Sequence, residues 1–249
     1  MIALISDVHG NLTALEAVLA DLDALAPGAR IWCLGDTVGY GSHPAECLDL
    51  VRARCEVVLA GNHDLAVAGD PRSAPSVEPG LWAGGPGAGI EHALRTLGPE
   101  RIAYLRTLQP SRVLDNVELH HGSDRDPVWE YVRSVESATA HLLEQRRELG
   151  AVGHTHMPLL WELPDGATEA TGGLMPSGSA FVLHRGTRRV FNPGSVGQPR
   201  DRDPRAGWAT LERGTLTFRR TEYDVAAAQA RILECGLPQE TADRLALGW

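Results

Sequence analysis

The first 60 residues alternate between short apolar runs and helical stripes of apolar positions. Residues 2–5, 31–34 and 57–59 are short runs of the kind found in buried strands. Apolar residues recur at helical spacing between Leu12 and Leu22, and a second stripe covers residues 47–51. Strands that alternate with helices in this way predict a mainly parallel sheet with right-handed crossovers.

This alternation stops between residues 65 and 115. Residues 71–89 are rich in Pro and Gly and predict an irregular loop. Within it, residues 84–89 predict a flexible turn and not a dinucleotide loop, because no strand precedes them and the glycine spacing is wrong. Residues 90–97 and 100–108 predict two short helices. We therefore expect a single domain over residues 1–249, with residues 65–115 as a helical and loop insertion near the site.

In the C-terminal half, apolar and polar positions alternate with a period of two residues. After a predicted helix over 135–147 and a strand that ends at Val152, short strands are expected at 159–163, 180–183, 189–191, 208–211 and 215–221. They predict an antiparallel second sheet, and residues 226–235 and 240–247 predict two closing helices. The expected architecture is α/β, with two packed sheets flanked by helices.

Composition excludes several classes of protein. The net charge is −9, and every basic residue is arginine. An acidic chain disfavours a nucleic-acid footprint, and the missing lysine excludes a P-loop or Schiff-base lysine. With no apolar run near 18 residues and an apolar start that reaches Asp7 after six residues, we expect no membrane span, no signal peptide and a cytoplasmic location. The four cysteines lack C-x-x-C spacing and are expected to be reduced thiols.

Clusters of metal-ligand residues follow five of the apolar runs. They are Asp7-Val8-His9, Gly35-Asp36, Gly61-Asn62-His63-Asp64, His121-Gly122 and Gly153-His154-Thr155-His156. Loops at the carboxyl ends of strands are where open α/β sheets build their sites. Imidazole and carboxylate together suit divalent cations such as zinc, manganese or iron. The sequence therefore predicts a metal-dependent enzyme.

Plainer roles compete with this interpretation. A histidine on its own is more often structural, and we assign His43, His92, His141 and His184 to that class. Asp7 and Asp36 could instead cap the helices that follow them. The convergence of so many ligand types at strand ends favours the metal, with His120 left as a neighbour of the site.

In this order, the motifs Asp-x-His, Gly-Asp, Gly-Asn-His-Asp, His-Gly and Gly-His-Thr-His resemble the calcineurin-like metallophosphoesterases. Residues 126–131 and 192–200 are similar to segments of the small bacterial phosphodiesterase branch. The resemblance implies a four-layer αββα sandwich of two mixed β-sheets flanked by helices. It also implies two divalent metal ions, manganese foremost, with iron, nickel or zinc as alternatives.

The same resemblance implies a role for each matching residue. One metal would be held by Asp7, His9, Asp36 and His156, and the other by Asp36, Asn62, His121 and His154. A hydroxide bridging the metals would attack phosphorus. His63 would protonate the leaving oxygen, while Asp64 would hold the His63 ring.

The sequence departs from one branch of this family. Protein Ser/Thr phosphatases and the symmetrical dinucleoside tetraphosphatases have Asp-Arg-Gly after their Gly-Asp motif, whereas residues 35–41 here contain no arginine. This lowers the expectation of a protein phosphatase. The candidate substrate contacts are Tyr40, Trp129, Tyr131 and Arg200, although the aromatic rings could serve packing alone and Arg200 could pair with surface carboxylates.

We therefore expect a phosphodiesterase acting on a small phosphoester, such as a nucleotide-like substrate. A dinucleoside polyphosphate hydrolase or a phosphomonoesterase is the alternative, and a metal-binding scaffold or regulatory module is the non-enzymatic one. Nucleic acid and membrane partners are not expected, and the oligomeric state is left open.

Overall fold

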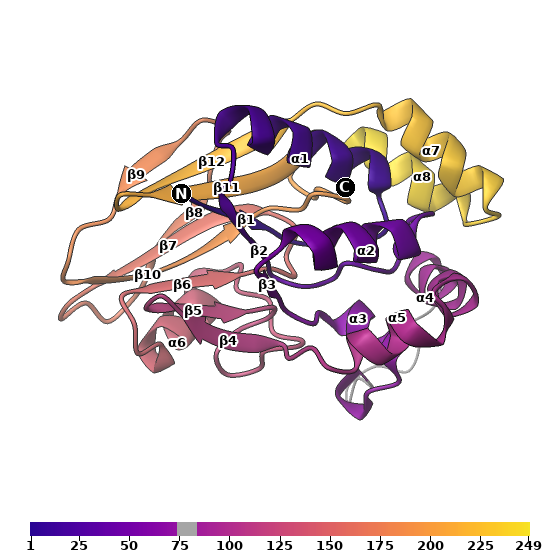
Figure 1. The fold of residues 1–249 in the computed structure, drawn as a ribbon. Helices are drawn as coiled ribbons and strands as arrows, with labels where there is room; N and C mark the ends of the chain where they lie inside the picture. Colours follow the sequence, from indigo (N-terminus) through magenta and orange to yellow (C-terminus); the bar gives the residue numbers. More distant parts are fainter. Residues whose placement is uncertain (74–83) are drawn as a thin grey trace.

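The computed structural model describes residues 1–73 and 84–249, which form a four-layer α/β sandwich (Figure 1). Two six-stranded mixed sheets pack face to face, and helices cover their outer faces. The sandwich of two mixed sheets implied by the family resemblance is thus confirmed. No helix in the described part of the chain is long and apolar enough to cross a membrane.

The first sheet joins the N-terminal strands to strands from the end of the chain. In spatial order it consists of β3 (Val57–Val58), β2 (Arg30–Cys33), β1 (Ile2–Ile5), β11 (Ala206–Glu212), β12 (Thr215–Thr221) and β9 (Ala180–Val182). β1, β2 and β3 are parallel, and the pairs from β1 to β9 are antiparallel. The predicted parallel unit is therefore present, but it makes up only half of this sheet.

The second sheet takes its strands from the middle of the chain. In spatial order it consists of β4 (Ser111–Leu114), β5 (Val117–His120), β6 (Leu149–Val152), β10 (Thr187–Pro193), β7 (Pro158–Pro164) and β8 (Thr171–Leu174). β5, β6 and β10 are parallel, while β4, β7 and β8 pair antiparallel. In both sheets the parallel strands lead into loops that carry the predicted ligands.

The helices lie on the outer faces and at one end of the sandwich. They are α1 (Leu12–Leu25), α2 (Pro44–Arg54), α3 (Asn62–Ala68), the 3-10 turn η1 (Pro71–Ser73), α4 (Gly85–Thr96), α5 (Gly98–Leu105), α6 (Val135–Glu144), α7 (Val225–Glu234) and α8 (Gln239–Leu247). Figure 1 shows α1 and α2 over the first sheet, α6 beside the second, and α3 to α5 grouped below α2.

The alternation of side chains along β1 divides the core. Leu4 points between the sheets, where it joins residues such as Trp32, Leu119 and Phe191. Ala3 and Ile5 face the other way and pack under α1 and α2. Because successive strand residues point to opposite faces, a strand buried on both sides must be apolar throughout. This is why the short N-terminal runs contain no polar residue before Ser6.

Two predictions about these elements are wrong. The late strands do not form an antiparallel sheet of their own, because β9, β11 and β12 extend the first sheet and β7, β8 and β10 extend the second. Residues 85–89 are the first residues of α4 and not a flexible turn. There, Gly89 allows close packing, since a Cβ on it would lie 2.1 Å from the Tyr40 backbone nitrogen. Residues 74–83 of the expected irregular loop lie outside the described residues.

Candidate metal centre

The five predicted ligand clusters meet at one edge of the sandwich. They occupy the loops that follow β1, β2, β3, β5 and β6. All seven predicted ligands have at most 4% of their surface exposed: Asp7, His9, Asp36, Asn62, His121, His154 and His156. Parallel strands of both sheets end at the same edge, so residues far apart in sequence become neighbours there.

Asp36 lies between two groups of these side chains. One group is Asp7, His9 and His156, with 3.4 Å between Asp7 Oδ1 and His156 Nε2. The other group joins Asp36 itself to His121 and His154. Asp36 Oδ2 is 3.6 Å from His9 Nε2 and 3.4 Å from His121 Nε2. A single carboxylate is therefore within reach of two adjacent ligand sets.

Backbone carbonyls determine which ring nitrogen of each histidine carries the proton. His9, His121 and His156 donate from Nδ1 to the carbonyls of Val38, Leu34 and Gln198, at 3.1, 2.9 and 2.7 Å. A carbonyl can only accept, so Nδ1 carries a proton, and in the neutral ring the lone pair is on Nε2. By the same reasoning His154, which donates from Nε2 to the Trp129 carbonyl at 3.2 Å, has its lone pair on Nδ1.

Two of these lone pairs then face each other with no proton between them, because His9 Nε2 and His156 Nε2 are 3.1 Å apart. His121 Nε2 is 3.1 Å from Asn62 Oδ1. Asp7 Oδ1 is buried and has no hydrogen-bond partner. Acceptors that converge at such distances repel unless a cation lies between them. The described residues therefore fit divalent metal ions, with a donor set of imidazole nitrogens and carboxylate or amide oxygens.

The backbone of the site is held in an uncommon conformation. Ten residues other than glycine have positive φ in the described chain. Six of them belong to the site: Asp7, His9, Asp36, Tyr40, His154 and His156. A left-handed residue of this kind costs on the order of 1–3 kcal/mol and turns its side chain sharply out of the strand direction. The strained turns are what aim both members of Asp-x-His and His-x-His at the centre.

Glycines in the motifs provide room for close contacts. A Cβ on Gly61 would lie 1.9 Å from Asp36 Oδ1, and one on Gly35 would lie 2.8 Å from His121 Nδ1. A Cβ on Gly153 would lie 2.2 Å from Ser6 Oγ. These three glycines therefore leave space for a neighbouring loop of the same centre.

Burial sets most of the protonation states. It lowers the pKa of His9, His154 and His156 well below the ordinary imidazole value, and it raises the pKa of Asp7 to about 7. Burial opposes protonation of His121 as well, yet the Asp36 carboxylate raises the pKa of His121 to about 9. Three of the four imidazoles are thus neutral and ready to bind a metal at neutral pH.

His63 and Asp64 lie at the start of α3. The His63 ring is 4.8 Å from the rings of both His9 and Tyr40, and burial lowers its pKa to about 4. We expected Asp64 to hold the His63 ring. Its carboxylate oxygens accept hydrogen bonds from the backbone amides of Thr37, Val38 and Gly61, at 3.0–3.2 Å. Asp64 therefore ties the loop after β2 to the loop after β3.

The predicted substrate contacts surround the centre. Tyr131 stacks on His154 with 4.1 Å between ring centroids, and the Trp129 carbonyl accepts the hydrogen bond from His154. The Arg200 guanidinium lies over the Tyr40 ring, 5.9 Å from its centroid, and Tyr40 is 4.8 Å from His9 between ring centroids. The structure thus brings all four residues close to the predicted ligands.

The sequence reasoning missed several supporting residues. The backbone carbonyl of Gln198 accepts a hydrogen bond from His156 Nδ1, while the side-chain Nε2 of Gln198 is buried with no hydrogen-bond partner. Asn192 donates to the Gly153 carbonyl and to Thr155 Oγ1, and Ser195 Oγ donates to the Asp7 carbonyl. The Asn-Pro-Gly-Ser stretch was the available signal. The carbonyl partners had none, because every residue has a carbonyl.

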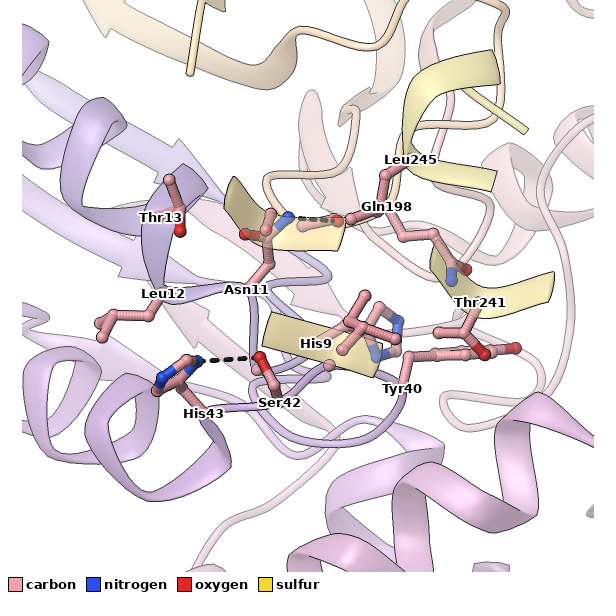
Figure 2. A pocket seen from close by; sticks show the side chains of 15 residues that line it. His9, Asn11, Leu12, Thr13, Tyr40, Ser42, His43, Gln198, Thr241 and Leu245 are labelled. Carbon is pink, nitrogen blue, oxygen red and sulfur yellow. Dashed lines mark hydrogen bonds between the residues drawn. The ribbon is translucent and has the colours of Figure 1, made fainter. Parts of the chain in front are cut away.

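A narrow pocket adjoins the centre on the side of the C-terminal helices (Figure 2). His9 and Tyr40 line it together with Gln198, while Thr241 and Leu245 of α8 form the facing wall. Asn11 caps α1 by accepting from the Ala14 amide, so Asp7 is not the cap of that helix. Asp36 is not the cap of the helix that follows it either, because the N-cap of α2 is His43. Asp36 Oδ1 instead accepts from the His63 amide at the start of α3.

The chain resembles proteins of one family over its whole length. A family model described as the calcineurin-like phosphoesterase superfamily domain matches residues 1–215. A protein of Methanocaldococcus jannaschii named uncharacterized protein MJ0912 is 31% identical, with 100% of this chain and 98% of that protein covered. A metallophosphoesterase of Sphaerobacter thermophilus has a solved structure that is 37% identical, with a TM-score of 0.84 and coverage of 100% and 98%. The hypothetical protein PH1004 of Pyrococcus horikoshii OT3 shares the fold, at 22% identity, a TM-score of 0.77 and coverage of 100% and 99%.

Proposed function

Because the chain belongs to the calcineurin-like phosphoesterase superfamily, we propose that it is a dinuclear metal-dependent phosphodiesterase acting on small or nucleotide-like substrates. The observation that carries the proposal is the arrangement of two sets of metal-ligand lone pairs that share Asp36. In this proposal residues 65–115 are an insertion in a single domain, and α4 of that insertion packs against Tyr40.

Each metal would have four protein ligands. Asp7, His9, Asp36 and His156 would hold one ion, and Asp36, Asn62, His121 and His154 would hold the other. When bound, two such ions supply Lewis acidity to the phosphoryl oxygens and lower the pKa of water. Manganese suits this mixed oxygen and imidazole set, as do iron, nickel and zinc.

The remaining residues of the site would act on the substrate. The incoming oxygen forms a bond to phosphorus while the bond from phosphorus to the leaving oxygen breaks. His63 would give a proton to that leaving oxygen. Burial lowers the pKa of His63 to about 4 in the free protein, and a bound phosphate anion beside the ring would favour the protonated form.

Arg200 and the aromatic rings support a diester of nucleotide type. The positive charge of Arg200 helps to lower the pKa of His9, His63, His154 and His156, and the same charge would attract a phosphate bound at this centre. Its Nε is buried without a hydrogen-bond partner and is free to donate to a phosphoryl oxygen. Tyr131 is 37% exposed beside His154, which leaves its ring available to a base or other flat group.

Metal removal tests the proposal directly. Protein treated with EDTA should lose hydrolysis of bis-p-nitrophenyl phosphate and regain it with Mn²⁺, while Asp36→Asn should stay inactive in Mn²⁺. A parallel assay with p-nitrophenyl phosphate separates a diesterase from a monoesterase. Full activity after chelation would contradict the metal mechanism. No turnover of any mono- or diester by the manganese-loaded protein would favour a metal-binding scaffold.

A further inference from the structure

A second group of ligand side chains lies on the outer face of the second sheet. Val117 and Leu119 of β5 point into the core between the sheets, so Glu118 and His120 point to the opposite face. Asp124 comes from the loop that follows β5. One ligand atom from each of Glu118, His120 and Asp124 lies within 4.8 Å of the other two.

We propose that Glu118, His120 and Asp124 bind one divalent transition-metal ion, zinc in the first instance, at a site separate from the dinuclear centre. His120 and His121 are neighbours in sequence, but β5 directs them to opposite sides of the sheet. The ion would therefore lie on the outer face of the strand that leads into a predicted ligand of the main centre.

His120 is the side chain that points to a missing ligand. It is 7% exposed, yet neither Nδ1 nor Nε2 has a hydrogen-bond partner. Buried polar atoms are almost always paired, and an exception calls for an ion or a water. His120 Nε2 is 3.5 Å from Asp124 Oδ1. Two ligands roughly 2.0–2.1 Å from one tetrahedral zinc are separated by roughly 3.4 Å, so this pair is spaced as shared ligands would be.

Glu118 is held in place for such a role. Its Oε1 accepts hydrogen bonds from the backbone amides of Arg146 and Arg147, which fix the carboxylate. The side chain is 5% exposed. Within residues 1–73 and 84–249, neither Glu118 nor Asp124 forms an ion pair with an arginine, so both negative charges remain for a cation.

The site is open to solvent through a cavity of about 620 Å³. Its lining combines the three ligand residues with Glu144 and three exposed arginines, Arg112, Arg146 and Arg147. Zinc with three protein ligands commonly completes its tetrahedron with water, for which the cavity leaves room. The bound ion would fix the loop at Asp124, and the same loop carries Trp129, whose carbonyl holds His154.

Counting metal ions tests this site independently of phosphoester hydrolysis. The full chain is equilibrated with zinc, passed through a desalting column and analysed for zinc per chain by mass spectrometry. We expect His120→Gln to bind one ion fewer than the wild type. His184→Gln, which changes an exposed histidine outside the cluster, should bind as many as the wild type.

Asp124→Asn provides a second variant at a partly exposed position, in case His120→Gln does not fold. It should also lose one ion, and both variants should lose part of the thermal stabilisation that zinc gives the wild type. Equal zinc content in the wild type and in the folded variants would overturn the proposal. The dinuclear centre can fail as a catalyst without altering this difference of one ion.

Discussion

At the residue scale, backbone carbonyls select which ring nitrogen of each predicted ligand histidine carries a proton. His9, His121 and His156 each donate from Nδ1 to a carbonyl of a neighbouring loop, which leaves Nε2 for the metal. Such partners fix ring orientation and tautomer together. The centre is therefore preorganised by main-chain atoms, and the identity of the carbonyl residues matters less than the path of their loops.

Loss of His63 should affect the departure of the leaving group. We expect His63→Ala to lower kcat by roughly 10²–10⁴-fold for a diester with an alkyl leaving group, because general acid catalysis contributes about that much. The loss should be smaller for p-nitrophenolate, which leaves without a proton. Steady-state kinetics with both substrates measure the difference. His184→Ala is the matched control, and an unchanged kcat for the alkyl ester would remove His63 from the proposed chemistry.

Arg200 should contribute to substrate binding. Its Nη2 donates to Gln198 Oε1 at 2.9 Å, which positions the guanidinium, and its buried Nε remains without a hydrogen-bond partner. We expect Arg200→Ala to raise KM about tenfold, equivalent to about 1.4 kcal/mol, with unchanged metal content. Arg202→Ala alters an exposed arginine two residues away and should behave as the wild type. A KM equal to that of the wild type would show that Arg200 does not contact substrate.

At the element scale, the turns that follow the strands direct the predicted ligands toward the centre. The loops after β1, β2 and β6 each place at least one ligand in the left-handed region, where the chain reverses sharply. Glycines at positions 35, 61 and 153 let these loops approach one another closely. The motifs are short because each turn needs only a ligand, a glycine and the end of a strand.

Helix α6 gives the fold a sensitivity to acid. His141 is fully buried there, accepts from the Asp124 amide at Nδ1 and donates from Nε2 to Gln145. Burial lowers the pKa of His141 from 6.5 to about 4. The folded state therefore binds fewer protons than the unfolded state, and stability is lost as the pH falls from 6.5 towards 4.

At pH 5 the lowered pKa of His141 reduces the free energy of unfolding by about 2 kcal/mol. Urea unfolding at pH 7 and pH 5 should show the loss in the wild type and a smaller one in His141→Gln. His184→Gln should retain the full loss, since His184 is exposed. A variant with the pH dependence of the wild type would show that His141 is not responsible. His63, whose pKa is also about 4, contributes equally to the wild type and the variants and cancels in the comparison.

At the scale of the whole molecule, the proposed metal centre joins residues that follow strands of both sheets. Asp7 and Asp36 follow strands of the first sheet, whereas His121, His154 and His156 follow strands of the second. Without cations the facing lone pairs of His9 and His156 repel across this junction. Metal ions should therefore stabilise the packing of the sandwich as well as the local loops.

Chelation should lower the melting temperature. An ion present at a hundred times its Kd adds about 2.7 kcal/mol, which for a chain of this size corresponds to roughly 5–10 °C. Differential scanning fluorimetry with Mn²⁺ and with EDTA measures the shift. Asp36→Asn should melt at nearly the same temperature in both conditions. An unchanged melting temperature for the wild type would contradict tight binding at the junction.

The sequence by itself determined the family, the candidate ligands and the local elements that display them. The apolar runs and the ligands behind them are local features, so they predicted β1 to β3, the helices between them and seven residues that converge in the structure. The assignment of strands to sheets was decided only by tertiary structure, because a period of two identifies the strands at 180–221 without naming their partners. The tertiary structure also decided which ring nitrogen of each histidine carries a proton. Carbonyls are common to every residue, and only the folded chain brings Val38, Leu34 and Gln198 to the rings. The contacts of Asp64 and the unpaired His120 beside Glu118 and Asp124 depend in the same way on loops that are distant in sequence.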